Sequence, residues 1–329
     1  MADRLALLVA PLGPNALALA MAVVLDLALG DPVYAWHPVR LIGNALTWME
    51  DRLRRAGLDG YGGGIVLFAG LTAASLVVAV AAIVAAGLVS EGAAWLAHVF
   101  ILYSMLALGD LLRHVRRIEA AVRAGDLAGA RTAVSALVGR DTDRLDGGGC
   151  RRAAVESLSE SLTDGFVSPV FWYVVAGLPG VVLFKVASTM DSMVGYKTPH
   201  YLRFGWCGAR LDDAMNYVPA RLTWLAIAAI ASLLPSYSGR KAWRVGLGQH
   251  ALLLGPNSGW SEAATAGALQ RKIVGPIWLK EVQVTDLWIG DPTDSPLETG
   301  DDVTRAMTIV TVTGLAIATV GSALLFRWR

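Results

Sequence analysis

Long apolar runs with at most one charged residue each dominate this chain, and they predict membrane-spanning helices. A helix needs about 20 mainly apolar residues to cross the hydrocarbon layer of a bilayer. Four runs are long enough: Leu5 to Leu29, Ile65 to Val89, Ala93 to Leu112 and Val303 to Phe326. The last run is followed by a basic and aromatic tripeptide, residues 327–329, which is typical of a membrane interface. We therefore expect at least four transmembrane helices.

Two further apolar runs, Phe166 to Ala187 and Val218 to Leu234, contain prolines. They predict broken or re-entrant helices, which membranes tolerate only where protein or a wet cavity covers the backbone. The fold expected is all-α: a polytopic integral membrane bundle of four to six spans forming a single domain, residues 1–329. Residues 113–165 are expected to form a cytoplasmic amphipathic helical insertion, because they carry nine arginines and basic loops face the cytoplasm.

Composition agrees with a membrane protein and excludes several other classes. Hydrophobic residues make up 55% of the chain and charged residues only 17%, so lipid rather than water surrounds much of it. The net charge is +1 and the basic residues form no clustered stripe, which argues against nucleic-acid binding. Cys150 and Cys207 lack CxxC spacing and indicate neither a zinc site nor a disulfide framework.

The first group of polar residues with candidate chemistry is Glu156, Glu160 and Asp164. Spacings of four place the three carboxylates on one helix face if the helix continues that far. A solvated acidic stripe is the simplest explanation. However, the stripe runs directly into the apolar segment at Phe166, where an uncompensated carboxylate is costly. Mg²⁺ or a basic substrate group would relieve the repulsion.

A second group follows the interrupted run. Asp191 and Lys197 lie in a polar segment that could simply cap the membrane interface. Asp212, Asp213 and Asn216 come soon afterwards, and Asp212 and Asn216 share a helix face. Paired acids and an amide are oxygen ligands that suit Mg²⁺.

Other polar residues are weaker candidates for contact with a substrate or a phosphate group. Their simpler explanations are an interfacial histidine, a charged surface loop and a helix capped by Ser258 or Ser261. Arginine does suit phosphate and carboxylate recognition through its fork of donors. The candidates are His37, Arg40, Arg140, Asp141, Arg221, Asn257, Ser258 and Glu262.

Taken in order, these motifs resemble the CobD/CbiB family, membrane synthases of cobalamin biosynthesis. The resemblance covers most of the chain. It departs from the family pattern at Ser161 and Ser188, where the family usually has Asn, and at Val274, where it has Gly. The strings that carry it are Gly30-Asp31-Pro32, His37 to Gly43, Val138 to Thr142, Glu156 to Pro169, Thr189 to Lys197, Arg210 to Arg221 and Pro256 to Ala264.

The resemblance implies a ligase that joins (R)-1-amino-2-propanol, or its phosphate, to a propionate of adenosylcobyric acid as an amide. A carboxylate is a poor electrophile, so ATP and Mg²⁺ are the expected activators, acting through an acyl phosphate. The enzyme would lie in the inner cell membrane with its active site on the cytoplasmic side, beside other enzymes of cobalamin assembly.

The roles that follow from this expectation divide the candidates into three sets. Arg140, Lys197 and Arg221 would neutralise phosphate or propionate, and Glu156 or Asp191 would take the proton of the amine. The catalytic set is Glu156, Glu160, Asp191 and Lys197. The metal set is Asp164, Asp212, Asp213 and Asn216, with Glu160 as a further acid for the metal.

Two other functions fit parts of the pattern. A transporter for a corrinoid or a small polar solute would also have intramembrane acids and broken helices. Its charges would lie near the middle of the spans, whereas Arg140, Glu160, Asp191, Asp213 and Asn257 all flank apolar runs. An inactive scaffold that presents intermediates to other enzymes is the third possibility.

Overall fold

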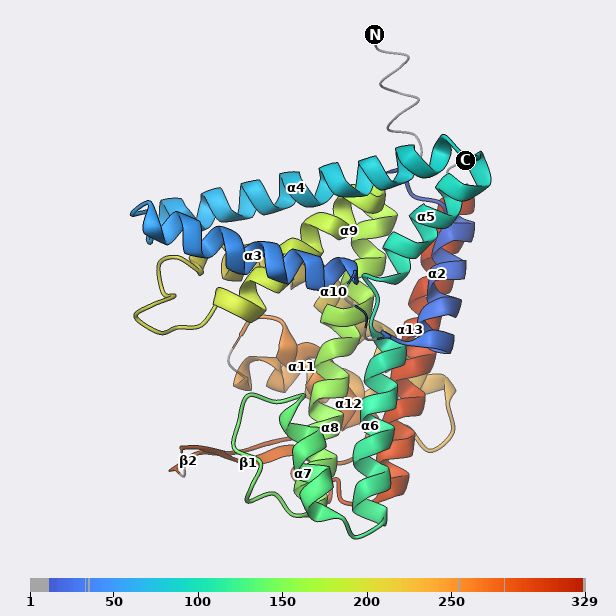
Figure 1. The fold of residues 1–329 in the computed structure, drawn as a ribbon. Coiled ribbons are helices and arrows are strands. Elements are labelled where there is room, and N and C mark those ends of the chain that lie inside the picture. The colour runs from blue at the N-terminus through green and yellow to red at the C-terminus, as the bar shows by residue number, and fades with distance from the viewer. Residues whose placement is uncertain (1–11, 33, 35, 254, 281, 328–329) are drawn as a thin grey trace. The chain divides into compact units, whose positions relative to one another are not determined.

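The structure is a computed structural model that describes residues 12–32, 34, 36–253, 255–280 and 282–327 (Figure 1). The chain divides into two compact units. The first unit comprises Met1–Ala107, Ser168–Asn216 and Ala318–Arg329, and the second comprises Leu108–Val167 and Tyr217–Ile317. The single domain of residues 1–329 stays a prediction, and residues 113–165 fall within the second unit.

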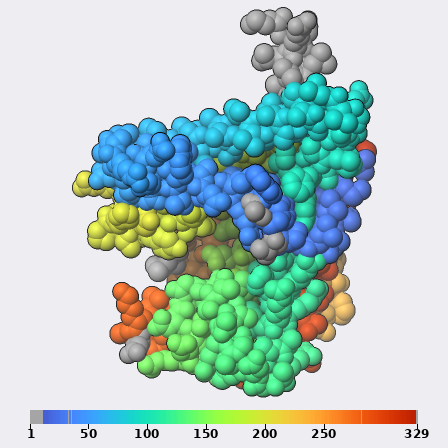
Figure 2. Space-filling view, in the orientation of Figure 1, coloured from blue at the N-terminus to red at the C-terminus, as the bar shows by residue number. Residues whose placement is uncertain are grey.

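The first unit consists of helices and connecting loops, with no strand in its described part. Helix α4 packs against α3, α5 and α9, and α2 packs against α5. Figure 2 shows α3 and α4 side by side as one continuous surface of this unit. Its helices are α2 (Ala16–Leu29), α3 (Pro38–Arg55), α4 (Tyr61–Gly87), α5 (Glu91–Tyr103) and α9 (Ser168–Val194).

The second unit packs α8 against α6, α7, α12 and the first strand of a hairpin, and α11 against α12. Helices α10 (Trp206–Leu233) and α13 (Gly300–Arg327) each contribute residues to both units. The other elements of this unit are α6 (Leu108–Arg123), α7 (Leu127–Ser135), α8 (Gly147–Leu162), a π-helical turn η2 (Thr163–Val167), α11 (Gly239–Gln249), a 3₁₀ turn η3 (His250–Leu252), α12 (Ser258–Leu269), β1 (Ile273–Leu279) and β2 (Val282–Ile289).

Local signals explain where several helices begin and break. The side chain of Asp146 accepts a hydrogen bond from the Gly149 amide at 2.6 Å and so starts α8, as a short acidic cap should. Within α9 the helical dihedrals fail at Ala176 and Gly177, just before Pro179. Gly177 has a φ of 65°, a conformation that only glycine adopts without strain. The expected break in the run from Phe166 is therefore present.

Among the described residues, three helical segments are long and apolar enough to cross a membrane, or four if the bent pair α5 and α6 counts as one span. These three are α4, the stretch Gly147–Val194 and α13. The run predicted from Ala93 corresponds to the bent pair, whose helices meet at 42°. The run from Val218 lies in α10, which does not meet this test. The beginning of the first predicted span and the terminal Trp328–Arg329 lie outside the described residues.

An antiparallel hairpin, β1 and β2, is the element that the sequence did not indicate. Gly275 faces Leu287 across the hairpin, and a bulge falls between Ile277 and Trp278. Val274 has a φ of 71°, which is unfavourable for a β-branched residue. The valine at this position, where the family resemblance predicts glycine, therefore places strain at the start of the hairpin.

Candidate functional site

Helix α12 buries a carboxylate in the second unit. Glu262 is 2% exposed, and its Oε2 atom has no hydrogen-bond partner among the described residues. Burial raises the pKa of Glu262 well above its ordinary value, and the negative charges of Glu156 and Glu160 raise it further. Arg140 and Asp164 also interact electrostatically with it. We call Arg140, Glu156, Glu160, Asp164 and Glu262 the Glu262 cluster.

The Glu262 cluster brings together residues from three parts of the chain. Arg140 Nη2 donates a hydrogen bond of 2.6 Å to Glu156 Oε2, and both side chains are largely buried. Glu160, one turn further along α8, is exposed, so the cluster extends from solvent to the buried Glu262. Four carboxylates outnumber the single guanidinium of the cluster, which therefore favours a cationic ligand.

The common face expected for Glu156, Glu160 and Asp164 exists only in part. Glu156 and Glu160 are on α8, whose α-helical register ends at Leu162. Asp164 lies in the π-helical turn η2 that follows, because the helix widens there. All three carboxylates nevertheless act on Glu262, so the tertiary structure gathers them in spite of the change in register.

The beginning of α12 holds a second arrangement. Arg221 Nη1, from α10, donates to Asn257 Oδ1 at 3.0 Å. Its guanidinium lies 3.5 Å from the centre of the Tyr217 ring and 5.0 Å from that of Trp260. Trp260 in turn stacks on His250 at 3.8 Å. Two aromatic contacts and the hydrogen bond to Asn257 hold the guanidinium of Arg221 in place, where it can bind an anionic group.

The expected cap of α12 is wrong. Asn257, not Ser258 or Ser261, is the N-cap residue, and it makes no side-chain cap hydrogen bond. Ser261 instead donates its hydroxyl to the Ser258 carbonyl at 3.2 Å. The Asn257 side chain is engaged by Arg221, which explains why it does not cap the helix.

Asp212 is the centre of the candidate residues in the first unit. Its Oδ2 atom accepts a hydrogen bond of 3.0 Å from Asn216 Nδ2, and Asn216 Oδ1 accepts one of 2.5 Å from Ser168. The expected common helix face of Asp212 and Asn216 is confirmed. Burial raises the pKa of Asp212 to about 7, with the negative charge of Asp191 adding to the effect. Asp212 Oδ1 is buried without a hydrogen-bond partner in the described chain.

The predicted magnesium ligands differ in whether their oxygen atoms already have partners. Asp213 pairs with Arg210 at 3.7 Å, and the oxygen of Asn216 is occupied by Ser168. Asp164 belongs to the second unit. Across the described residues no three His, Cys, Asp or Glu side chains form a group that could hold a metal ion. Mg²⁺ usually takes one or two carboxylates together with phosphate oxygens and water, a role that the free oxygen of Asp212 fits.

The remaining candidates lie outside these two groups. His37 is 3% exposed and its Nε2 lies 2.7 Å from Asp31 Oδ1, whereas Arg40 is exposed. Lys197 is exposed and acts electrostatically on Asp213.

The loop that contains Arg140 and Asp141 is held by the hairpin. The Asp141 amide donates to the Trp278 carbonyl at 3.0 Å, and the Arg144 guanidinium lies 4.4 Å from the centre of the Trp278 ring. Sequence reasoning did not identify Trp278 as a residue that contacts this loop. The only feature of the sequence that could have pointed to it is its position soon after Val274-Gly275.

Comparison with known proteins identifies the family. The family model described as CobD/Cbib protein matches residues 19–310. A cobalamin biosynthesis protein CobD of a Sinorhizobium species is 40% identical over 315 residues, covering 89% of this chain and 93% of that protein. The CobD protein of Rhizobium meliloti is 42% identical, covering 84% and 86%, and that of Citrobacter koseri is 35% identical, covering 92% and 95%. No solved structure matches the chain.

The match runs through both units and through both groups of candidate residues. The apolar helices agree with it, because they describe a helical membrane bundle. This chain therefore belongs to the CobD/CbiB family and is a membrane protein with a role in cobalamin biosynthesis.

Proposed function

We propose that the protein is an amide-forming ligase that attaches aminopropanol, or its phosphate, to a propionate of adenosylcobyric acid. The observation that carries this proposal is the Glu262 cluster, a buried and predominantly negative group with an unpartnered carboxylate oxygen. Family membership supports the pathway, and the cluster supplies the chemistry for an amine substrate.

In this proposal the Glu262 cluster binds the amine as its ammonium ion. Glu160, which is exposed, would meet the incoming cation first. Binding of the cation would favour the ionised form of Glu262, and this carboxylate would then accept a proton from the ammonium nitrogen and leave a neutral amine with a lone pair. Glu262 suits this role better than Glu156, because Arg140 already donates a hydrogen bond of 2.6 Å to Glu156, whereas Glu262 Oε2 has no hydrogen-bond partner among the described residues.

Arg221 and the first turn of α12 would bind the anionic partner, either propionate or phosphate. The amides in the first turn of a helix and its dipole favour negative charge, and Arg221 is fixed beside them by Asn257. Glu262 follows Asn257 by five residues, which is a rise of about 7 Å along a helix. The same helix would therefore present an anion site and an amine site at a distance suited to joining them.

Activation of the propionate needs energy, and we propose ATP with Mg²⁺ as its source. Mg²⁺ would reduce the negative charge on phosphate oxygens when bound. Within the first unit, Asp212 is the residue that we propose to hold an ion, because one of its oxygens has no hydrogen-bond partner among the described residues and Asp191 acts on it electrostatically. The amine nitrogen would form its bond to the activated carbonyl carbon, and phosphate would leave with the electrons of the broken bond. We place this site on the cytoplasmic side of the inner membrane.

The test uses the full chain purified in detergent, with adenosylcobyric acid, ATP, Mg²⁺ and either aminopropanol or its phosphate. Product mass and phosphate release are followed for wild type, Glu262→Gln and the control Glu298→Gln, whose side chain is 63% exposed. We expect amide product that requires ATP and Mg²⁺, loss of turnover in E262Q and normal turnover in E298Q. Corrinoid binding without product in the wild type would instead support the transporter or the scaffold.

A further inference from the structure

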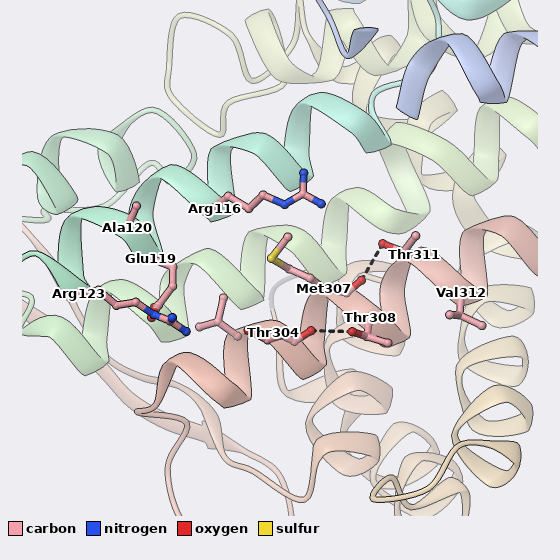
Figure 3. A pocket seen from close by; sticks show the side chains of 10 residues that line it. Arg116, Glu119, Ala120, Arg123, Thr304, Met307, Thr308, Thr311 and Val312 are labelled. Atoms are coloured by element: carbon pink, nitrogen blue, oxygen red, sulfur yellow. Dashed lines mark hydrogen bonds and ion pairs between the residues drawn. The ribbon is translucent and has the colours of Figure 1, made fainter. Parts of the chain in front are cut away.

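A cavity of about 530 Å³ lies between α6 and the part of α13 that belongs to the second unit (Figure 3). Figure 3 shows Arg116 and Arg123 extending from α6, with Thr304, Met307 and Thr308 of α13 opposite them. No member of the Glu262 cluster lines this cavity, and neither does Arg221. It is therefore separate from the site proposed for the reaction.

The α6 side of the cavity carries excess positive charge. Glu119 is the carboxylate that lines it, and it accepts hydrogen bonds from Arg123 at 2.6 Å and from Arg151 at 2.7 Å. Arg116 also lines the cavity, and in the described chain no hydrogen-bond or ion-pair partner occupies its guanidinium. Two guanidinium groups and one carboxylate therefore line this side, and the carboxylate is also engaged by Arg151, which leaves the side attractive to an anion.

The α13 side of the cavity combines apolar side chains with threonines. Thr304, Thr308 and Thr311 donate their hydroxyls to carbonyls one turn earlier in the same helix, at 2.9, 2.9 and 2.7 Å. Their hydroxyl hydrogens are donated within the helix, and Met307 and Val312 complete this wall with apolar side chains. The cavity therefore has a basic side and an apolar side.

Both walls belong to helices that take part in candidate membrane spans. Helix α13 is long and apolar enough to span by itself, and α6 follows α5 in the bent pair that can form one span. Basic pockets at the cytoplasmic ends of such helices bind anionic headgroups. Four arginines of α6, Arg113, Arg116, Arg117 and Arg123, also mark its end of the membrane as the cytoplasmic one.

We propose that this cavity binds one anionic phospholipid, with its phosphate against Arg116 and Arg123 and an acyl chain along Met307 and Val312. The phosphate would supply negative charge opposite Arg116 and Arg123. The acyl chain would cover an apolar wall that water wets poorly. This proposal does not depend on the reaction that the protein catalyses.

The test is native mass spectrometry of the full chain in a neutral detergent, titrated with dioleoylphosphatidylglycerol or dioleoylphosphatidylcholine. Arg116→Gln removes the unpaired guanidinium, and Arg117→Gln is the matched control, because Arg117 is exposed on the same helix but does not line the cavity. We expect wild type and R117Q to retain phosphatidylglycerol in preference to phosphatidylcholine. R116Q should weaken the binding of phosphatidylglycerol by about fivefold, the effect of one cation near an anionic lipid.

Equal retention of the two lipids, or equal losses in R116Q and R117Q, would overturn the proposal, because binding would then not depend on charge in this cavity. A parallel titration with inorganic phosphate separates a lipid site from a site for free phosphate. Displacement of phosphatidylglycerol by millimolar phosphate would show that the cavity selects the free ion, which also contradicts the proposal.

Discussion

Replacing Asp212 by asparagine should make the protein more stable at alkaline pH while it removes activity. The substitution keeps the size of the side chain, and the new amide oxygen can still accept the 3.0 Å hydrogen bond from Asn216. What it removes is a negative charge that is buried near Asp191. Functional sites often contain residues that lower the stability of the fold, and Asp212 would be one of them.

The size of the gain follows from the pKa of Asp212. Burial raises this pKa from an ordinary 3.8 to about 7, a difference of about three pH units. Because the folded protein holds the proton more tightly than the unfolded chain, wild type loses stability as the pH rises from about 4 to about 7. Each pH unit is worth about 1.4 kcal/mol, so the loss at pH 8 is at most about 4 kcal/mol. The corresponding loss at pH 5 is about 1.5 kcal/mol.

The assay is thermal denaturation in detergent, followed by tryptophan fluorescence from pH 5 to pH 8. The midpoint of D212N should exceed that of wild type by roughly 5 °C at pH 8, and the difference should shrink towards pH 5. Asp143→Asn, on an exposed loop, is the control and should show no such trend. A D212N difference that is independent of pH, or a D212N protein less stable than wild type at pH 8, would refute the reasoning.

Three other substitutions test separate parts of the structure. Glu262→Gln should abolish turnover. Because burial raises the pKa of Glu262, the variant should also become more stable to heat than wild type as the pH rises above 4.5. Melting curves at a series of pH values would contradict this if the variant were the more stable protein only in acid. Arg140→Gln should lower the free energy of unfolding by about 3–5 kcal/mol, because it leaves Glu156 buried and unpaired. In a double-mutant cycle, adding Glu156→Gln should restore most of this loss. Additive losses would disprove the coupling between the two residues. Gly205→Ala should lower the free energy of unfolding by about 1–3 kcal/mol, because the new Cβ atom would overlap the Val194 carbonyl oxygen. An unchanged melting temperature would contradict this and show that the loop adjusts its backbone without loss of stability.

Features set by neighbours along the chain were predictable from the sequence. The apolar runs from Ile65 and Val303 became α4 and α13, because apolar length alone decides whether a helix suits a bilayer. The break near Pro179 and the contact between Asp212 and Asn216 are also local, since one depends on backbone restriction and the other on a spacing of four.

Predictions were less successful where a feature depends on residues that are distant in the sequence. A serine was expected to cap α12, but Arg221 takes the side chain of Asn257 and the cap bond is not made. The hairpin was not anticipated, because β1 contains a proline and its strand pairing depends on residues across a turn.

The sequence by itself determined that this is a helical membrane protein of the CobD/CbiB family and which polar residues carry candidate chemistry. Only the tertiary structure decided how those residues combine. Glu262 is about a hundred positions from Glu156 in the chain, yet the packing of α12 on α8 places both in one buried cluster with Arg140. Spacing can put residues on a common helix face, but only packing can remove a carboxylate from water and give it the raised pKa on which the proposed chemistry depends.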